Sequence, residues 1–293
     1  MIRVGFMSDV HCEFESPGPP ARPTARWVAL QQQRRSIQGH PDLGPILDHL
    51  RGAVDLMVLA GDIDIGPRAI DYADRVALFL GCRTIIVMGN HEGYRGRDLD
   101  LMIPEMRAAA AATQGRVLFL ENDAVVLDMA GDRLHVLGCC LWTDYQILGT
   151  PQESMAKAAT ILADHSRITL RGRRFMPAHA RELHDASRQW LASEVGRIRA
   201  AEGEAAKILI VTHHAPHMDG NPPQYRGGEL APAFSSDLTA EIAAWRPVAW
   251  IFGHTHAGTL RLDVAGIPVV CAQRGYVCDE PGAEEFLPAT MEI

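Results

Sequence analysis

Histidine, aspartate and asparagine recur where short apolar runs of the sequence end. The run VAWIF at 248–252 is followed by Gly253 and then by His254 and His256, with one residue between the two histidines. The pair could lie in a polar loop, where each ring meets solvent or a backbone carbonyl. It could equally bind a metal ion, because neutral imidazole is the commonest metal ligand in proteins. Gly253 would let the backbone approach such a site closely.

Four other apolar runs end in residues of the same kind. These residues are Asp9 with His11, Asp62 with Asp64, Asn90 with His91, and His213 with His214. Any one pair could be a turn or a helix cap. Because ligands of α/β proteins gather at the carboxyl ends of strands, five such ends in one chain predict a shared site. Carboxylate and imidazole ligands without thiolate favour Mn, Fe or Zn.

The motifs DxH, GD, GNHE, H and GHTH, in this order, resemble those of the calcineurin-like metallophosphoesterase superfamily. The resemblance runs from residue 2 to about 276. It implies a β-sandwich with flanking helices that holds two metal ions in one cleft. One metal would be bound by Asp9, His11 and His256, the other by Asn90, His213 and His254, and Asp62 would bridge both. His254 and His256 would then face different metals from one loop.

The resemblance also implies a hydrolase that cleaves a phosphate ester, either a phosphomonoester or a small phosphodiester. Two cations about 3.5–4 Å apart can hold phosphate oxygens and generate hydroxide at neutral pH. This metal-bridging hydroxide would attack phosphorus directly. His91 is the expected general acid for the leaving oxygen, a contribution of roughly 10²–10⁴-fold.

The alternative function is a catalytically inactive binding or scaffold protein with the same fold. Such a protein is expected to have lost metal ligands or the acid. Here all seven expected ligands and His91 are present, so the sequence favours the enzyme.

One motif departs from the family pattern. Many members read GDxxD, whereas this chain reads GDIDIG, so that Asp64 stands one position early. Asp64 could orient His91, or it could cap a helix that begins near Pro67.

Four residues are candidates for substrate contact, namely Tyr94, Arg95, Asp144 and Arg174. Asp144 could equally belong to a strand-to-loop turn. Arg174 closes a basic run that begins with Arg171 and Arg173. This run is either a solvated helix face or part of a cap over the cleft that meets the phosphate ester.

The elements that must position these residues follow from hydrophobic patterning. Apolar runs at 2–9, 54–62, 83–91, 206–214 and 248–256 predict buried strands, and segments 43–51, 69–80 and 103–113 predict helices, with Pro104 in a first turn. The runs within 116–142 predict closely spaced strands with a hairpin turn at Gly131-Asp132, and 260–272 predicts a second hairpin. The expected fold class is therefore α/β, with two packed mixed β-sheets flanked by helices.

The 293 residues fit a single metallophosphoesterase-like domain, 1–293, with insertions near 13–40 and 150–203, the second of them helical. The formal net charge of -8 argues against binding long nucleic acids. The expected partner is a small phosphate-ester substrate, with nucleotides among the candidates. Six cysteines without a CxxC motif, and no signal-peptide or transmembrane run, predict a cytoplasmic protein without a membrane partner.

Overall fold

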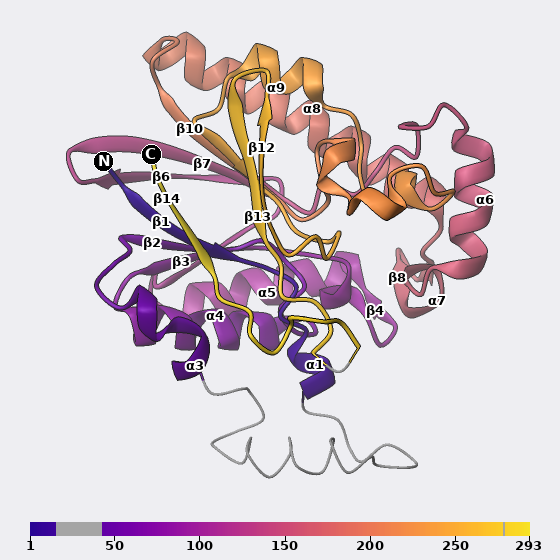
Figure 1. The fold of residues 1–293 in the computed structure, drawn as a ribbon, viewed down its shortest axis with the longest axis horizontal. Helices are drawn as coiled ribbons and strands as arrows, with labels where there is room; N and C mark the ends of the chain where they lie inside the picture. Colours follow the sequence, from indigo (N-terminus) through magenta and orange to yellow (C-terminus); the bar gives the residue numbers. More distant parts are fainter. Residues whose placement is uncertain (16–42, 278) are drawn as a thin grey trace.

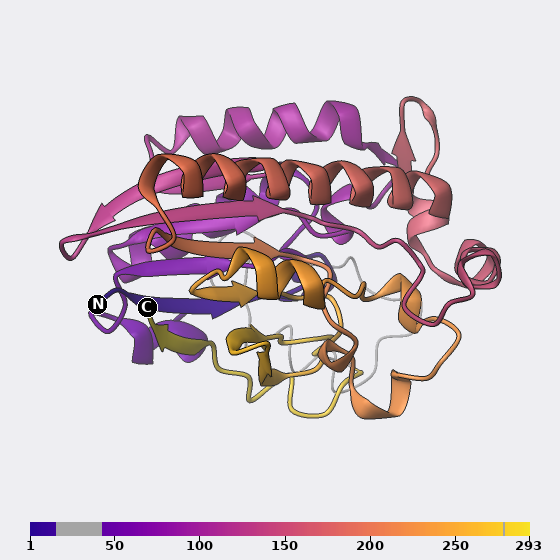
Figure 2. The same cartoon turned by 90° about the horizontal axis from the view of Figure 1, so that it is seen from above.

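Two β-sheets lie face to face in the computed structural model, which describes residues 1–15, 43–277 and 279–293 (Figure 1). Helices cover the outer face of each sheet, and Figure 2 shows the same layers from above. The predicted α/β sandwich with flanking helices is therefore confirmed. In the described part of the chain, no helix combines the length and apolar character that crossing a bilayer requires.

The first sheet has the strand order β14-β1-β2-β3-β5. Its parallel strands are β1 (Arg3–Met7), β2 (Leu56–Leu59), β3 (Arg83–Val87) and β5 (Val117–Leu120), and β14 (Ala289–Glu292) pairs antiparallel with β1. The strands β1, β2 and β3 are buried at nearly every position, as expected when both faces of a sheet are covered. The helices α4 (Pro67–Leu80) and α5 (Leu99–Ala112) pack on the outer face.

The second sheet has the order β12-β13-β11-β10-β7-β6. Its central strands β7 (Asp132–Cys139), β10 (Lys207–Thr212), β11 (Ala249–Ile251) and β13 (Ile267–Ala272) are parallel, and β6 (Asp123–Met129) and β12 (Thr259–Val264) are antiparallel edge strands. The helices α8 (Pro177–Glu202) and α9 (Thr239–Trp245) cover its outer face.

Both predicted hairpins are present. Ala130-Gly131 links β6 to β7 and Ala265-Gly266 links β12 to β13, with positive φ at all four residues. Two consecutive residues of this kind make the type I′ turn that matches the twist of paired strands. The first turn lies one residue earlier than predicted, because Asp132 already pairs with Met129 in the ladder.

Alternate residues of the strands fill two different interiors. In β10, Leu209 and Val211 face the space between the sheets, whereas Ile208 and Ile210 pack against the helices outside. Because both faces of these strands are buried, their sequences are continuous apolar runs. The functional loops begin where these runs end.

One local prediction is wrong, and another is confirmed only in part. The helix α5 begins at Leu99, where the carboxylate of Asp98 accepts a hydrogen bond of 3.1 Å from the backbone N–H of Asp100, so Pro104 lies inside the helix rather than in its first turn. The segment predicted as a helix at 43–51 forms only one turn of α-helix, α3 (Gly44–Leu47), followed by a 3₁₀ turn at Asp48–Leu50.

The second predicted insertion is mostly helical, with α6 (Pro151–Ile161), α7 (Asp164–Arg167) and the whole of α8. Its basic run is not a helix face. Arg173–Arg174 form strand β9, which joins β8 (Ile168–Leu170) and β4 (Arg97–Asp98) in a small sheet, after a turn in which Arg171 and Gly172 both have positive φ. The first predicted insertion, 13–40, lies outside the described residues except at its start, where α1 spans Cys12–Glu15.

Buried Glu121 links the two sheets, because its carboxylate, just after β5, accepts a hydrogen bond of 2.8 Å from the backbone N–H of Cys140, just after β7. Burial raises the pKa of Glu121 to about 8, from 4.5 in an open chain. Between these two values the unfolded chain releases a proton that the folded chain keeps. Folding therefore becomes less favourable as pH rises, by up to about 1.4 kcal/mol per pH unit.

We expect Glu121→Gln to increase the free energy of unfolding near pH 8 and to change it much less near pH 5. The amide stays neutral at both pH values and its carbonyl can still accept the bond from Cys140. Urea denaturation of both proteins at the two pH values measures the difference. An equal change at both would show that the ionisation of Glu121 does not contribute.

Candidate metal centre

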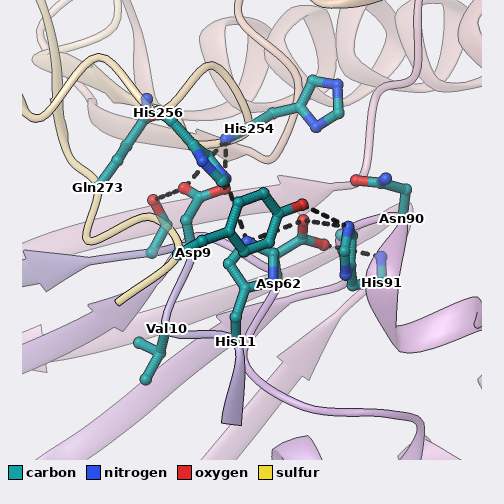
Figure 3. A network of polar contacts seen from close by, with 12 residues as sticks. Asp9, Val10, His11, Asp62, Asn90, His91, His254, His256 and Gln273 are labelled. Atoms are coloured by element: carbon teal, nitrogen blue, oxygen red, sulfur yellow. Dashed lines mark hydrogen bonds and ion pairs between the residues drawn. The ribbon is translucent and has the colours of Figure 1, made fainter. Parts of the chain in front are cut away.

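The loops that follow β1, β2, β3, β10 and β11 meet at one end of the sandwich. The structure brings together there all seven side chains expected to bind metal, namely Asp9, His11, Asp62, Asn90, His213, His254 and His256. Figure 3 shows Asp9, Asp62, His91 and His256 pointing toward one another from different loops. The parallel strand order explains this meeting, because parallel strands present their carboxyl ends at the same edge.

One group consists of Asp9, His11 and His256. The Nε2 atoms of His11 and His256 lie 3.1 Å apart, and His256 Nε2 lies 3.5 Å from Asp9 Oδ1. Nitrogen and oxygen lone pairs thus converge on a point that a cation could occupy.

A second group surrounds His213. Its Nε2 atom lies 3.0 Å from Asn90 Oδ1, 3.1 Å from His254 Nδ1 and 3.4 Å from Asp62 Oδ1. The other oxygen of Asp62, Oδ2, lies 3.9 Å from His11 Nε2. Asp62 therefore faces both groups, one carboxylate oxygen to each, which is the position required of a bridging ligand.

Left-handed backbone conformations aim these side chains. Asp9, His11, Asp62, His254 and His256 all have φ between 50° and 74°, a region that residues other than glycine rarely adopt. Such conformations cost of order 1–3 kcal/mol each and persist where the surroundings enforce them, typically at functional sites. They also explain the spacing of DxH and HxH, since a sharp turn can direct alternate residues to one centre.

A glycine is required beside the histidine pair, as the sequence indicated. A Cβ atom on Gly253 would lie 2.7 Å from the carbonyl oxygen of Ala60 and 3.0 Å from Asp9 Oδ2. No side chain fits that space unless the Ala60 backbone or the Asp9 carboxylate moves.

Hydrogen bonds behind the histidines orient their rings. The Nδ1 atoms of His11, His213 and His256 lie 3.1 Å from Glu13 Oε1, 2.8 Å from the Ala60 carbonyl and 2.5 Å from Glu280 Oε1. Each Nδ1 can donate a proton to its acceptor, which leaves Nε2 directed at the group. The donor set of carboxylate, amide and imidazole, held in this way, fits two divalent cations.

The four histidines differ in pKa. Burial lowers the pKa of His11 and of His254, so both rings are neutral and able to bind metal. Burial acts in the same direction on His213 and His256, but nearby carboxylates outweigh it and raise the pKa of His213 to about 9 and of His256 to about 10. Metal binding to either group must therefore displace a proton.

His91 lies between Asp62 and the cavity. Its Nδ1 atom is 2.7 Å from Glu13 Oε1, and its Nε2 atom is 3.3 Å from the hydroxyl of Tyr276 and 3.9 Å from Asp62 Oδ2. Distances alone also group His91 with His11 and Asp62 as ligands of one ion. Unlike His11, however, His91 lines the cavity, as does Tyr276 beside its Nε2.

Glu13 was missed by the sequence analysis because it lies at the start of a segment interpreted as an insertion. It is buried and contacts both His11 and His91 through one oxygen, Oε1. Glu13 therefore occupies the place considered for Asp64. The carboxylate of Asp64 instead accepts from the backbone N–H of Ile65 at 2.7 Å and lies 2.9 Å from Arg68, so it neither orients His91 nor caps α4.

Two other residues of the motifs have supporting roles. The buried carboxylate of Glu92 accepts hydrogen bonds from the backbone N–H groups of Asp62, Ile63 and Gly89, and so joins two of the functional loops. Burial raises its pKa to about 8. His214 turns away from Asp62, with its Nδ1 3.2 Å from the carbonyl of Cys140, as expected for the neighbour of His213 on a strand end.

Asp164, from the helical insertion, was also missed. Its Oδ1 atom accepts hydrogen bonds from Asn90 Nδ2 at 2.8 Å and from the hydroxyl of Tyr94 at 2.6 Å. Because a carboxylate accepts but does not donate, the NH₂ of Asn90 must face Asp164. The carbonyl oxygen of Asn90 must then face His213, where a metal would need it.

We expect Asp164→Ala to lower the metal affinity of the group around His213 about tenfold to hundredfold, since Asn90 would lose the carboxylate that orients its amide. Titration of the loaded protein with a chelator measures the two affinities separately. Tyr94→Phe is the matched control, because it removes the other partner of Asp164, a hydroxyl that makes only a long contact of 3.5 Å with Asn90, and leaves the bond of 2.8 Å between Asn90 and Asp164. Two sites of parental affinity in Asp164→Ala would contradict this role.

A cavity of ≈ 1020 Å³ opens beside the centre and is lined by Asp62, Asn90, His91, His254 and His256 among others. Tyr94 lines it too, with its ring stacked on His91 at a centroid distance of 4.0 Å.

The other three substrate candidates are described residues that do not line this cavity. Arg95 is exposed with positive φ, in the loop after the 3₁₀ turn at His91–Gly93. The carboxylate of Asp144 accepts a hydrogen bond of 2.9 Å from the backbone N–H of Gln146, which is the turn considered as its alternative. Arg174 donates to the backbone carbonyls of His165 and Ala159.

Solved structures similar to this chain share its fold. A phosphopantetheinyl hydrolase from Mycobacterium tuberculosis is 15% identical with a TM-score of 0.61, over 95% of this chain and 96% of that one. A dimetal phosphatase from Danio rerio is 15% identical with a TM-score of 0.52, over 99% of this chain and 91% of that one. A search among curated proteins found no match. The sequence model of calcineurin-like phosphoesterases matches residues 2–258, and the chain belongs to this family.

Proposed function

We propose that this protein is a hydrolase that uses two metal ions to cleave a phosphate ester, with His91 as general acid. The observation that carries the proposal is the position of Asp62, which presents one oxygen to each of two ligand groups at the wall of a cavity. The likeness to a dimetal phosphatase accords with two ions. Mn, Fe and Zn are the proposed metals, from the oxygen and nitrogen donor set.

Two cations bound there would polarise the phosphoryl oxygens and lower the pKa of a water molecule. The protein's own residues supply the rest. His91 lines the cavity, and its Nε2, beside the hydroxyl of the cavity residue Tyr276, would protonate the leaving oxygen. Burial lowers the pKa of His91, but the charge of Asp62 and the hydrogen bond to Glu13 outweigh it and raise this pKa above its usual value. The raised pKa favours the protonated form that an acid requires.

Glu13 and Tyr276 position the acid. Glu13 holds Nδ1 of His91, and the Tyr276 hydroxyl reaches Nε2. The ring of Tyr276 also lies beside His11 and His256, at centroid distances of 4.5 and 4.7 Å, and so excludes water from one side of the centre. Tyr276 thus lines the cavity and also contacts the proposed general acid, His91.

The proposed substrate is a small ester, a phosphomonoester or a small phosphodiester, with nucleotides among the candidates, and the proposed location is the cytoplasm. Four described cysteines support that location, because Cys82, Cys139, Cys140 and Cys271 are free thiols. The size of the cavity supports a small substrate over a long nucleic acid.

The test is to strip the protein of metal, reload it with Mn, Fe, Zn or Mg, and measure hydrolysis of p-nitrophenyl phosphate and bis(p-nitrophenyl) phosphate. Metal-dependent turnover of either compound supports the hydrolase, and the ratio of the two rates separates monoesterase from diesterase. Two bound metals with no turnover of any ester would favour a binding protein that has kept the fold.

A further inference from the structure

The cavity is lined by apolar as well as polar side chains. Besides the metal-binding loops, the end of α6 and residues 221–234 contribute to its walls. These segments carry the apolar side chains of Ile161, Leu162, Tyr225, Leu230 and Phe234, of which Phe234 stacks on His254 at a centroid distance of 4.7 Å. Ile161 is 53% exposed and Tyr225 is 62% exposed, although both are large and apolar. Apolar side chains gathered at the mouth of a pocket indicate a site for an apolar group.

Both cationic side chains on these walls are engaged in ion pairs. Arg226 donates to the carbonyls of Asn221 and Asp219 at 3.0 Å each, and it lies 2.9 Å from the Asp219 carboxylate. Lys157 lies 2.8 Å from Glu229. Among the described residues that line the cavity, every lysine and arginine therefore already has an acidic partner.

Acidic groups reinforce this pattern. Asp164, Glu229 and Glu280 also line the cavity, and Asp164 and Glu280 serve the metal centre through Asn90 and His256. Glu229 is paired with Lys157, so away from the metal centre the charged groups of the walls are paired and the remaining lining is largely apolar. Such walls offer no unpaired cation to a second anionic group, and they accept an uncharged one.

We propose that this cavity binds the organic part of the phosphate ester, and that this part is apolar and uncharged, so that the reacting phosphate is the only anionic group of the substrate. The inference rests on the proposed function, because it places that phosphate at the metal centre. It favours esters of apolar alcohols over esters that carry a further phosphate or a carboxylate.

Binding of alkylphosphonates to the manganese-loaded protein tests this inference without turnover, because these compounds have no P–O–C bond to cleave. Calorimetric titration with ethyl, butyl, hexyl and octyl phosphonate compares chains that share one head group. We expect affinity to rise about two- to fourfold for each added methylene until the chain fills the cavity. A carboxylate at the end of the hexyl chain should lower affinity about tenfold, since it would lose water at an apolar wall whose cations are already paired.

Two variants locate the effect. Ile161→Ser and Tyr225→Ser each remove one exposed apolar side chain from the wall, and each should reduce the dependence of affinity on chain length. Leu101→Ser is the matched control, because Leu101 is 68% exposed on α5 and does not line the cavity. The control should keep the full dependence on chain length.

An affinity that does not change with chain length would overturn the inference. So would a terminal carboxylate that strengthens binding, because Lys157 or Arg226 would then have exchanged its acidic partner for the ligand. The proposed function is judged separately by turnover of p-nitrophenyl phosphate. If the protein hydrolyses p-nitrophenyl phosphate but its affinity for alkylphosphonates does not change with chain length, the apolar site is ruled out and the hydrolase stands. If affinity rises with chain length but no ester is hydrolysed, the apolar site stands and the hydrolase is ruled out.

Discussion

Replacing His91 by alanine is expected to leave two metal ions in place and to lower turnover of esters with poor leaving groups by roughly 10²–10⁴-fold. The loss arises because an alkoxide leaves slowly without a proton, and His91 is a cavity-lining histidine outside the proposed ligand set. The measurements are kcat for an alkyl phosphate and the metal content per chain.

The leaving group itself supplies the control. p-Nitrophenolate departs without protonation, so His91→Ala should slow hydrolysis of p-nitrophenyl phosphate much less than that of an alkyl phosphate. His91→Asn should behave in the same way. Equal losses on both esters, together with a lower metal content, would instead make His91 a ligand, as its distance of 3.9 Å from Asp62 also allows.

The convergence of the strand ends could be predicted from the sequence because the information is local. Each apolar run shows where a strand stops, and the residues that follow it are the ones that meet in the structure. The parallel order of the strands then needs no further signal, since runs separated by helical segments form crossover connections. The pairing of Asp62 with two groups was implied by the resemblance and not by spacing.

The orientation of these side chains could not be predicted, because it depends on distant residues. Asp164 is 74 positions from Asn90, and nothing in the pattern around either residue indicates their contact. The position of Glu13, two residues after His11, did not by itself predict a role. Only the structure shows that Glu13, in the short helix α1, contacts both His11 and His91. Patterning reports burial and period, whereas these hydrogen bonds depend on tertiary packing.

The basic run shows a different limit. Its three arginines lie in a segment flanked by helices, and composition favours a helix for Arg173 and Arg174. The pair Arg171-Gly172 instead turns the chain back, and β9 pairs with β8 for only two residues. So short a strand has too few residues for a period of two to be recognised.

Asp62→Asn is expected to have the largest effect on metal content. The backbone N–H of His91 donates to Asp62 Oδ1 at 2.8 Å, so an asparagine would keep its carbonyl oxygen there and place its NH₂ where Oδ2 stands. That NH₂ cannot bind a cation, and it faces His11. The group of Asp9, His11 and His256 therefore loses a ligand, and both groups lose the negative charge that Asp62 places between two cations.

We expect the parent to keep two metals per chain after dialysis against a weak chelator, and Asp62→Asn to keep fewer than one. Asp64→Asn is the matched control, because it removes a buried carboxylate two positions away that pairs with Arg68 outside the metal groups. That variant should keep both metals. If Asp62→Asn also held two metals with parental affinity, a carboxylate shared by the two ions would not be the element that holds them together, and the assignment of a dinuclear centre would fail with it.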